Sequence, residues 1–243
     1  WQFFERICIR KAQIIITVSP SIGDLLKSTY DLSEVLIVRN VPEGNTAIGS
    51  MTKEDLGLNP DKSILLLQGN GINVNRGGEE LVESMKGIEN AHLLVIGNGD
   101  AMPALKELSA SLNLTHKITF LPRMPYAKMM RYTACADIGF SLDKNDNINY
   151  RFSLPNKIFD YAMAGLPMIT SDLPEVSSFV TKNDIGVGLK EGSPDAISSA
   201  VNQLIQDRDK LNRLRENAGE IGAHLSWETE FKPVIDRLKE LDA

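Results

Sequence analysis

The fold of this chain is decided by one stretch, Leu154 to Asp172, which reads Leu-Pro-Asn-Lys-Ile-Phe-Asp-Tyr-Ala-Met-Ala-Gly-Leu-Pro-Met-Ile-Thr-Ser-Asp. Pro155 suits the first turn of a helix, where a backbone N–H would have no partner. Apolar residues between Ile158 and Met163 recur at helical spacing. Gly165 tolerates the left-handed conformation that commonly ends a helix, and Met168 to Thr170 reads as a short buried strand. The stretch therefore predicts a loop, a short helix and a strand of the parallel type.

The start of this predicted helix combines two kinds of polar group. Its unpaired N–H groups and its dipole make an anion site. Asp160, one turn further on, is a carboxylate that can accept hydrogen bonds from two hydroxyls. Amides for phosphate and a carboxylate for a diol together favour a nucleotide ligand. A structural explanation stays open, because an acid early in a helix stabilises it by about 0.3 to 1 kcal/mol, and Lys157 also fits an exposed helix lysine.

Apolar strands alternate with helices along the rest of the chain. Strands are predicted at residues 14–19, 35–39, 64–68, 92–96, 118–121, 137–142 and 187–189. Helices are predicted at 20–27, 52–57, 79–86, 102–112, 126–134, around 176, at 195–207, at 210–221 and from 227 onward. This alternation predicts an α/β fold with a Rossmann-like, doubly wound parallel sheet. Ligands of such sheets bind outside the carboxyl ends of the strands, so the loops 69–78, 97–101, 122–126 and 143–156 should meet at one crevice.

Composition excludes several classes of protein. The 243 residues carry a net charge of −6 without a long basic run, which argues against nucleic acid as a partner. No apolar run is long enough to span a bilayer, and no signal-peptide pattern opens the sequence. Cys8 and Cys135 are expected to be thiols in a reducing, cytoplasmic compartment. The three histidines show no metal-ligand spacing, so no metal site is expected.

Two arginines lie in loops that follow predicted strands. Arg76, in Asn75-Arg-Gly-Gly78, could clamp a diphosphate through bidentate hydrogen bonds, or it could be a solvated loop residue. Arg123, in Leu-Pro-Arg-Met-Pro, could flank a base or be solvated. Two glycine patterns, Gly97-Asn-Gly99 and Gly69-Asn-Gly71, lack the third glycine of a dinucleotide fingerprint and the acid that should follow it. They predict tight strand-to-helix turns rather than an NAD site.

Pieces along most of the chain occur in the order found in one enzyme family. They are AQIIITVS at 12–19, VRNVP at 38–42, QG at 68–69, RG at 76–77, LVIGNG at 94–99, ITFLP at 118–122, ADIGFS at 136–141, the stretch 154–172, PE at 174–175, DIGVG at 184–188 and SWE at 226–228. In this order they resemble the C-terminal half of the glycosyl transferases group 1 family. Its members are retaining glycosyltransferases of the GT-B fold, in which two Rossmann-like domains face a cleft.

The resemblance implies an organisation and a function. Residues 1–41 would be the tail of the N-terminal, acceptor-side domain with the linker, 42–226 the C-terminal nucleotide-sugar-binding domain, and 227–243 a C-terminal helix. The linker itself is expected at Asn40 to Gly44. The enzyme would be a hexosyltransferase that moves a sugar from a UDP- or GDP-sugar to a glycan or lipid-linked acceptor. It would be cytoplasmic or peripheral to the inner membrane face. This chain would be mainly its donor-binding half and depend on a missing N-terminal domain.

The resemblance also implies site residues. Asp160 stands where the family has a glutamate that binds the ribose, and Arg76 where a lysine binds the diphosphate. Arg76 is therefore expected to act in catalysis as well as in binding. The expected donor-binding set is Gly69, Asn70, Arg76, Pro122, Arg123, Leu154, Pro155, Asn156, Lys157 and Asp160. No metal and no cofactor beyond the nucleotide-sugar substrate are expected.

The chain departs from the family pattern at three positions. Phe152 stands where the first of two paired acids is usual, Asn70 stands where an arginine is frequent, and Asp160 is one methylene shorter than the usual acid. Phe152 and Asn70 favour one alternative, a non-catalytic domain that binds a nucleotide or a protein. A separate alternative is a sugar-nucleotide epimerase of the GT-B fold, which would need catalytic acids and a histidine that the sequence does not show at recognisable places.

Overall fold

The computed structural model describes residues 2–43 and 52–241, and its core is a six-stranded parallel sheet. The strands are β3 (Ser63–Gly69), β4 (Ala91–Gly97), β5 (Ile118–Leu121), β6 (Ile138–Ser141), β7 (Met168–Ser171) and β8 (Gly186–Leu189). Their order across the sheet is β5-β4-β3-β6-β7-β8, and every neighbouring pair is parallel. This is the doubly wound order of a Rossmann-like sheet, so the predicted fold class is confirmed.

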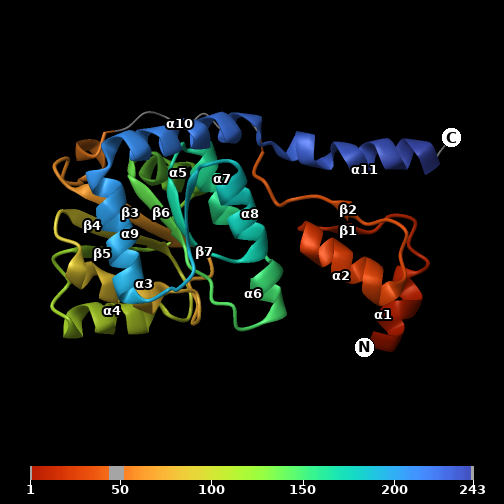
Figure 1. Cartoon of the computed structure of the whole chain (residues 1–243), viewed down its shortest axis with the longest axis horizontal. Coiled ribbons are helices and arrows are strands. Elements are labelled where there is room, and N and C mark those ends of the chain that lie inside the picture. Colours follow the sequence, from red (N-terminus) through yellow and green to blue (C-terminus); the bar gives the residue numbers. More distant parts are fainter. Residues whose placement is uncertain (1, 44–51, 242–243) are drawn as a thin grey trace.

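Helices cover both faces of the sheet because successive side chains of a strand point to opposite faces. In β3, Leu65 and Leu67 pack into the core beneath α3 (Gly78–Ser84), α4 (Met102–Ser111) and α9 (Pro194–Gln206). Ile64 and Leu66 pack into the opposite core, beneath α5 (Tyr126–Cys135), α7 (Asn156–Met163) and α8 (Pro174–Lys182). The helix α10 (Arg208–His224) contacts both α7 and α9 and runs along the top of the view in Figure 1.

The N-terminal segment forms a separate small unit. It contains α1 (Gln2–Ile9), β1 (Ile16–Thr17), α2 (Pro20–Tyr30) and β2 (Leu36–Ile37), with β1 and β2 paired only with each other. These strands are shorter than the predicted 14–19 and 35–39. The last helix, α11 (Trp227–Leu241), leaves α10 and lies over this unit (Figure 1). Arg39 pairs there with Glu230 of α11.

The linker and the start of α11 meet, since the backbone N–H of Trp227 donates a 3.1 Å hydrogen bond to the carbonyl of Pro42. The boundaries proposed at residues 41/42 and 226/227 therefore lie at one place in the molecule. The domain division itself stays a prediction. Trp1, the end of the predicted linker at Gly44, and residues 242–243 lie outside the described residues.

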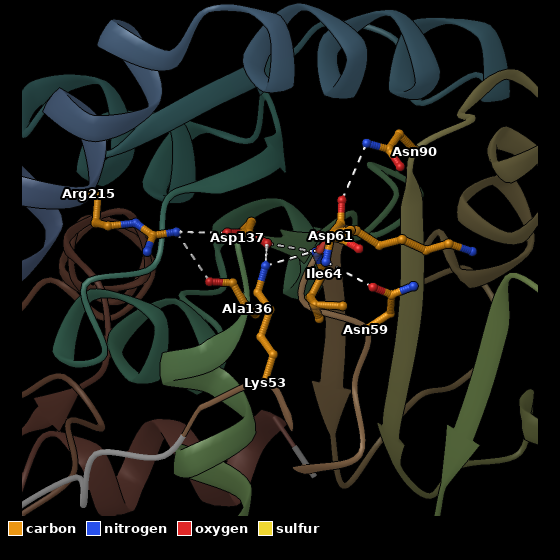
Figure 2. A network of polar contacts seen from close by, with 9 residues as sticks. Lys53, Asn59, Asp61, Ile64, Asn90, Ala136, Asp137 and Arg215 are labelled. Carbon is orange, nitrogen blue, oxygen red and sulfur yellow. Dashed lines mark hydrogen bonds and ion pairs between the residues drawn. The ribbon is translucent and has the colours of Figure 1, made fainter. Parts of the chain in front are cut away.

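The amino ends of the central strands are joined by a polar network around Asp137, which directly precedes β6 (Figure 2). Its Oδ2 accepts hydrogen bonds from Lys53 Nζ at 2.7 Å and from the backbone N–H of Ile64 at 2.8 Å. Its Oδ1 accepts a 3.2 Å bond from Arg215 of α10. One side chain thus holds β3, β6, α10 and the segment before β3 together at the end of the sheet opposite the predicted crevice.

Three predicted segments differ in detail from the structure. The loop predicted at 143–156 contains a short helix, α6 (Ile148–Phe152), which begins where the side chain of Asn147 accepts a hydrogen bond from the N–H of Tyr150. The segment predicted as a helix at 52–57 is a 3₁₀ turn, η1 (Glu54–Leu56), and the helix predicted at 79–86 ends in another, η2 (Met85–Gly87). Both are single turns that lack the length for α-helical hydrogen bonding.

Candidate functional site

The candidate site lies where the direction of the sheet's connections reverses. After β3 the chain crosses to β4 on one side, and β6 lies on the other, so the loops after β3 and β6 diverge and leave a crevice between them. A cavity of about 840 Å³ lies there, a size typical of ligand pockets. Each of the four loops that were predicted to converge contributes lining residues, and the linker residues 40–42 line it as well.

Most of the predicted site residues reach this cavity. Those that line it are Gly69, Asn70, Arg76, Arg123, Pro155, Asn156, Lys157 and Asp160. Leu154 is instead buried in the apolar core beneath α7. Pro122 is exposed and is not among the lining residues. Phe152 is also outside the lining, and its carbonyl accepts a 2.8 Å hydrogen bond from Ser19 Oγ of the N-terminal unit.

Two cations lie near each other at the mouth of the crevice. The guanidinium of Arg76 is 3.4 Å from the buried carboxylate of Asp143 and lies over the ring of Tyr150, 4.8 Å from its centroid. Burial lowers the pKa of Lys157; the nearby Asp143 raises it and Arg76 lowers it further. Within the described part of the chain, the ammonium of Lys157 has no hydrogen-bond acceptor, so it is available to a ligand.

The helix α7 begins beside these cations. Pro155 is its N-cap, with φ −63° and ψ 136°, and it lines the cavity. The first-turn N–H groups of a helix have no intrahelical acceptor, so those of Asn156 and Lys157 are free to bind an anion. At the other end, Gly165 has φ +63°, which confirms its predicted role in ending the helix. The residues that carry these amides, the ammonium and the guanidinium therefore line the same cavity, and groups of these kinds suit a phosphate.

Asp160 borders the same cavity one turn deeper. It is 7% exposed, and its two oxygens accept hydrogen bonds from Gln68 Nε2 at 3.2 Å and from Tyr126 Oη at 2.8 Å. Burial raises the pKa of Asp160, and the two hydrogen bonds oppose that shift. Thr133, which is fully buried, donates a 2.7 Å bond to Gln68 Oε1. The carboxylate is thus held in place by a chain of side chains that ends in the core.

Sequence reasoning missed four residues of this site: Tyr126, Gln68, Asp143 and Tyr150. Gln68 was noticed only as part of the family pattern, and a polar residue at the end of an all-apolar strand was the available signal. Tyr126 opens α5 and ends the loop 122–126 that is predicted to reach the crevice, but no residue pattern indicates a role for its side chain. Asp143 and Tyr150 lie in a loop for which no local periodicity exists. Each of the four contacts a residue that is distant in the sequence, and local sequence patterns do not indicate such contacts.

Glycines let the loops of the site approach each other closely. A Cβ on Gly97, whose φ is +136°, would lie 1.8 Å from the carbonyl oxygen of Gly69. A Cβ on Gly77, whose φ is +71°, would lie 2.4 Å from Cβ of Leu142. Only glycine fits either position. The close approach at Gly97 agrees with its predicted place in a tight strand-to-helix turn.

No group of three or more His, Cys, Asp or Glu side chains within the described residues is placed to hold a metal ion. None of the described helices combines the length and the apolar character needed to cross a bilayer.

The chain matches the model of a known protein family. A sequence profile described as "Glycosyl transferases group 1" matches residues 52–220, which is more than half of the chain. The matched range includes every residue that lines the crevice except those of the linker.

Curated relatives are similar at low identity. A chitobiosyldiphosphodolichol beta-mannosyltransferase from Candida albicans is 22% identical over 240 residues, covering 89% of this chain and 51% of that protein. A D-inositol 3-phosphate glycosyltransferase from Nocardia farcinica is 26% identical over 132 residues, covering 54% of this chain and 28% of that protein. The chain therefore spans about half the length, or less, of these relatives.

Solved structures share the fold. Sucrose-phosphate synthase from Thermosynechococcus elongatus matches 98% of this chain and 60% of its own with a TM-score of 0.80 at 18% identity. HepE from Anabaena, solved in complex with UDP and glucose, matches 95% of this chain and 64% of its own with a TM-score of 0.80 at 14% identity. Both similarities establish the same arrangement of helices and strands, that of the GT-B glycosyltransferases.

Proposed function

This chain belongs to the glycosyl transferases group 1 family, and from that premise we propose that it is the donor-binding half of a glycosyltransferase. The whole enzyme would move a hexosyl group from a nucleotide-sugar to a glycan or lipid-linked acceptor. Retention of configuration at the sugar is part of the proposal because the family resemblance implies it. The Candida relative is named for a β-linked product. Retention is therefore tested directly, by measuring the anomeric configuration of the product by NMR.

One observation carries the proposal. The two cations Arg76 and Lys157 and the first-turn amides of α7 meet at the cavity that Asp160 also borders. A phosphate can bind to the two cations and the amides, while a vicinal diol can donate hydrogen bonds on the side of the cavity that Asp160 borders. A nucleoside diphosphate carries these two groups at a fixed separation. The solved complex of HepE with UDP and glucose supports this class of ligand for the fold.

The same groups would assist the chemistry. When the bond between the sugar's anomeric carbon and the diphosphate oxygen breaks, negative charge grows on the departing diphosphate and positive charge on the sugar. Arg76, Lys157 and the α7 amides would stabilise that growing charge more than they stabilise the bound donor, which lowers the barrier. The acceptor hydroxyl would then form the new bond to the anomeric carbon and give up its proton, for which the departing diphosphate is an acceptor that the reaction itself supplies.

The acceptor site is assigned to the N-terminal domain, most of which this chain lacks in the proposed organisation. We therefore expect the chain to bind nucleotide but to transfer little or no sugar. The whole enzyme would be cytoplasmic, and a lipid-linked acceptor would bring it to the membrane surface. Robust sugar transfer by this 243-residue chain would contradict the assignment.

The test is binding of nucleotides to the purified chain. A thermal-shift screen with UDP-, GDP-, ADP- and CMP-sugars should identify one base, and calorimetry should then give its affinity. Arg76→Met should weaken the nucleoside diphosphate about 10-fold or more, and the nucleoside much less, because a charged hydrogen bond is worth about 1.5 to 3 kcal/mol. Arg213→Met is the matched control. Arg213 lies on α10, pairs with Asp184 and does not line the cavity. Equal losses for both variants would contradict the site.

One observation favours a second candidate, a domain that binds nucleotide without catalysis. The position of the first paired acid holds Phe152, whose carbonyl is tied to Ser19 and whose side chain cannot bind sugar hydroxyls. Assaying the full-length protein with the identified donor separates the two, since only an enzyme consumes it. The epimerase alternative needs a histidine, and none of the three histidines lies among the residues that line the cavity.

A further inference from the structure

We infer that Tyr126 is a ligand-binding residue of this site: its phenol oxygen, rather than the carboxylate of Asp160 alone, accepts a hydrogen bond from a pentose hydroxyl. This inference rests on the proposed function and deepens it, since it concerns the recognition of ribose in the same cavity. It starts from the 2.8 Å hydrogen bond between Tyr126 Oη and Asp160 Oδ1.

The two residues differ in how much of each is exposed. Both line it, but Asp160 is 7% exposed whereas Tyr126 is 38% exposed. Each oxygen of Asp160 already accepts one hydrogen bond from the protein, from Gln68 and from Tyr126. An aspartate is also one methylene shorter than a glutamate, so its carboxylate stays closer to α7. The phenol extends the polar group of Asp160 toward the space that a ligand would occupy.

The direction of the hydrogen bond decides what the phenol can bind. Burial, together with the charge of Asp160 and the hydrogen bond to it, raises the pKa of Tyr126, so the phenol keeps its proton. That single proton is donated to Asp160, and the lone pairs of the phenol oxygen remain for the ligand. Toward the cavity, Tyr126 is therefore an acceptor only. It should select a ligand group that donates, such as a hydroxyl, and reject a group that only accepts.

The geometry of the site keeps this acceptor in position. Tyr126 is the first residue of α5 and follows Pro125, whose carbonyl accepts hydrogen bonds from the N–H groups of Lys128 and Met129. Its partner Asp160 is fixed by Gln68, which is 1% exposed and held by Thr133. Contacts with two helices and a strand thus fix the phenol oxygen in place. Little conformational entropy of this side chain is then lost when a ligand binds.

The experiment begins with the wild-type chain. Calorimetry with ADP, GDP, UDP and CDP identifies the base, and the 2′-deoxy, 3′-deoxy and 2′-fluoro-2′-deoxy forms of that nucleotide follow. We expect at least one deoxy form to bind about 5- to 10-fold more weakly than the ribonucleotide, the scale of one neutral hydrogen bond. If the 2′-hydroxyl is the donor, the fluoro form should bind as weakly as the deoxy form, because fluorine cannot donate.

The variant Tyr126→Phe then isolates the phenol oxygen. It should bind the ribonucleotide about 5- to 10-fold more weakly, bind the discriminating deoxy form as the wild type does, and so lose the discrimination. Tyr132→Phe is the matched control, because Tyr132 lies on the same helix, packs against the core and does not line the cavity. It should leave every affinity unchanged.

The outcomes separate this inference from the function on which it rests. If none of the four nucleoside diphosphates binds the wild type, the proposed function fails and the inference fails with it. If one binds, but Tyr126→Phe keeps the discrimination or binds the ribonucleotide more tightly, the pentose uses the carboxylate directly. The inference is then wrong while the proposed function stands.

Discussion

The carboxylate of Asp143 lies 3.4 Å from the guanidinium of Arg76, with only 3% of the Asp143 side chain exposed. Neither of its oxygens accepts a hydrogen bond from any residue in the described ranges 2–43 and 52–241. It also raises the pKa of Lys157. Asp143 therefore balances the two cations of the site when no phosphate is present, and it would repel a phosphate that approaches them.

Asp143→Asn should separate these two effects. Without its charge the cations repel each other, so we expect the free energy of unfolding to fall by about 1 to 3 kcal/mol. A nucleoside diphosphate no longer meets a like charge and should bind about 3- to 10-fold more tightly. Chemical denaturation and calorimetry measure the two quantities. Asp146→Asn, in the same loop but exposed, is the control, and weaker binding by Asp143→Asn would contradict this account.

The pH dependence of binding should report on Lys157. Burial lowers the pKa of its ammonium in the free protein, and a bound diphosphate would raise it again. Between the two pKa values the complex holds the proton and the free protein does not. Binding therefore takes up a proton, and affinity falls as pH rises through that window.

Calorimetry in buffers of different ionisation enthalpy measures this uptake. It should be done above about pH 8, where the ligand's own phosphate, with a second pKa near 6, is fully ionised. Lys157→Arg should remove the dependence, because a guanidinium stays charged at these pH values. An unchanged pH slope in that variant would show that another group takes up the proton.

Removal of Asp160 should weaken nucleotide binding. Asp160→Ala is expected to reduce the affinity for the nucleoside diphosphate by roughly 1.5 to 3 kcal/mol, the scale of a hydrogen bond to a charged group. It also leaves the buried amide of Gln68 without its acceptor, so a loss of stability of about 1 to 3 kcal/mol should accompany it. Asp160→Asn keeps the shape and an acceptor for Tyr126. Unchanged affinity in a folded Asp160→Ala variant would rule out a role in binding the pentose.

The network around Asp137 should matter for stability and not for binding. Asp137→Ala removes the acceptor of the Ile64 N–H and the partner of Lys53 and Arg215, so we expect a loss of about 2 to 4 kcal/mol in the free energy of unfolding. Asp137→Asn retains an acceptor for the N–H and should lose less. Urea denaturation measures both. Nucleotide affinity of the folded variants should stay at the wild-type value, because Asp137 lies at the opposite ends of the strands.

The sequence predicted which residues line the cavity where they lie at the start of a helix. Pro155, Asn156 and Lys157 were found because helix termini have a local signature, and the cavity does reach them. Leu154 and Pro122 do not line the cavity, so their expected part in donor binding rests on the family resemblance alone. The role of each lining residue in binding stays a prediction.

The alternation of apolar strands and helices by itself determined the layered parallel sheet, its covered faces and the crevice at the carboxyl ends. Periodicity and helix-end signals are local, so neighbouring residues are enough to encode them. Only the tertiary structure decided that Tyr126 meets Asp160, 34 residues away, and that Asp143 lies near both Arg76 and Lys157. Such pairs depend on strand order and on how each crossover packs, which are properties of the whole chain.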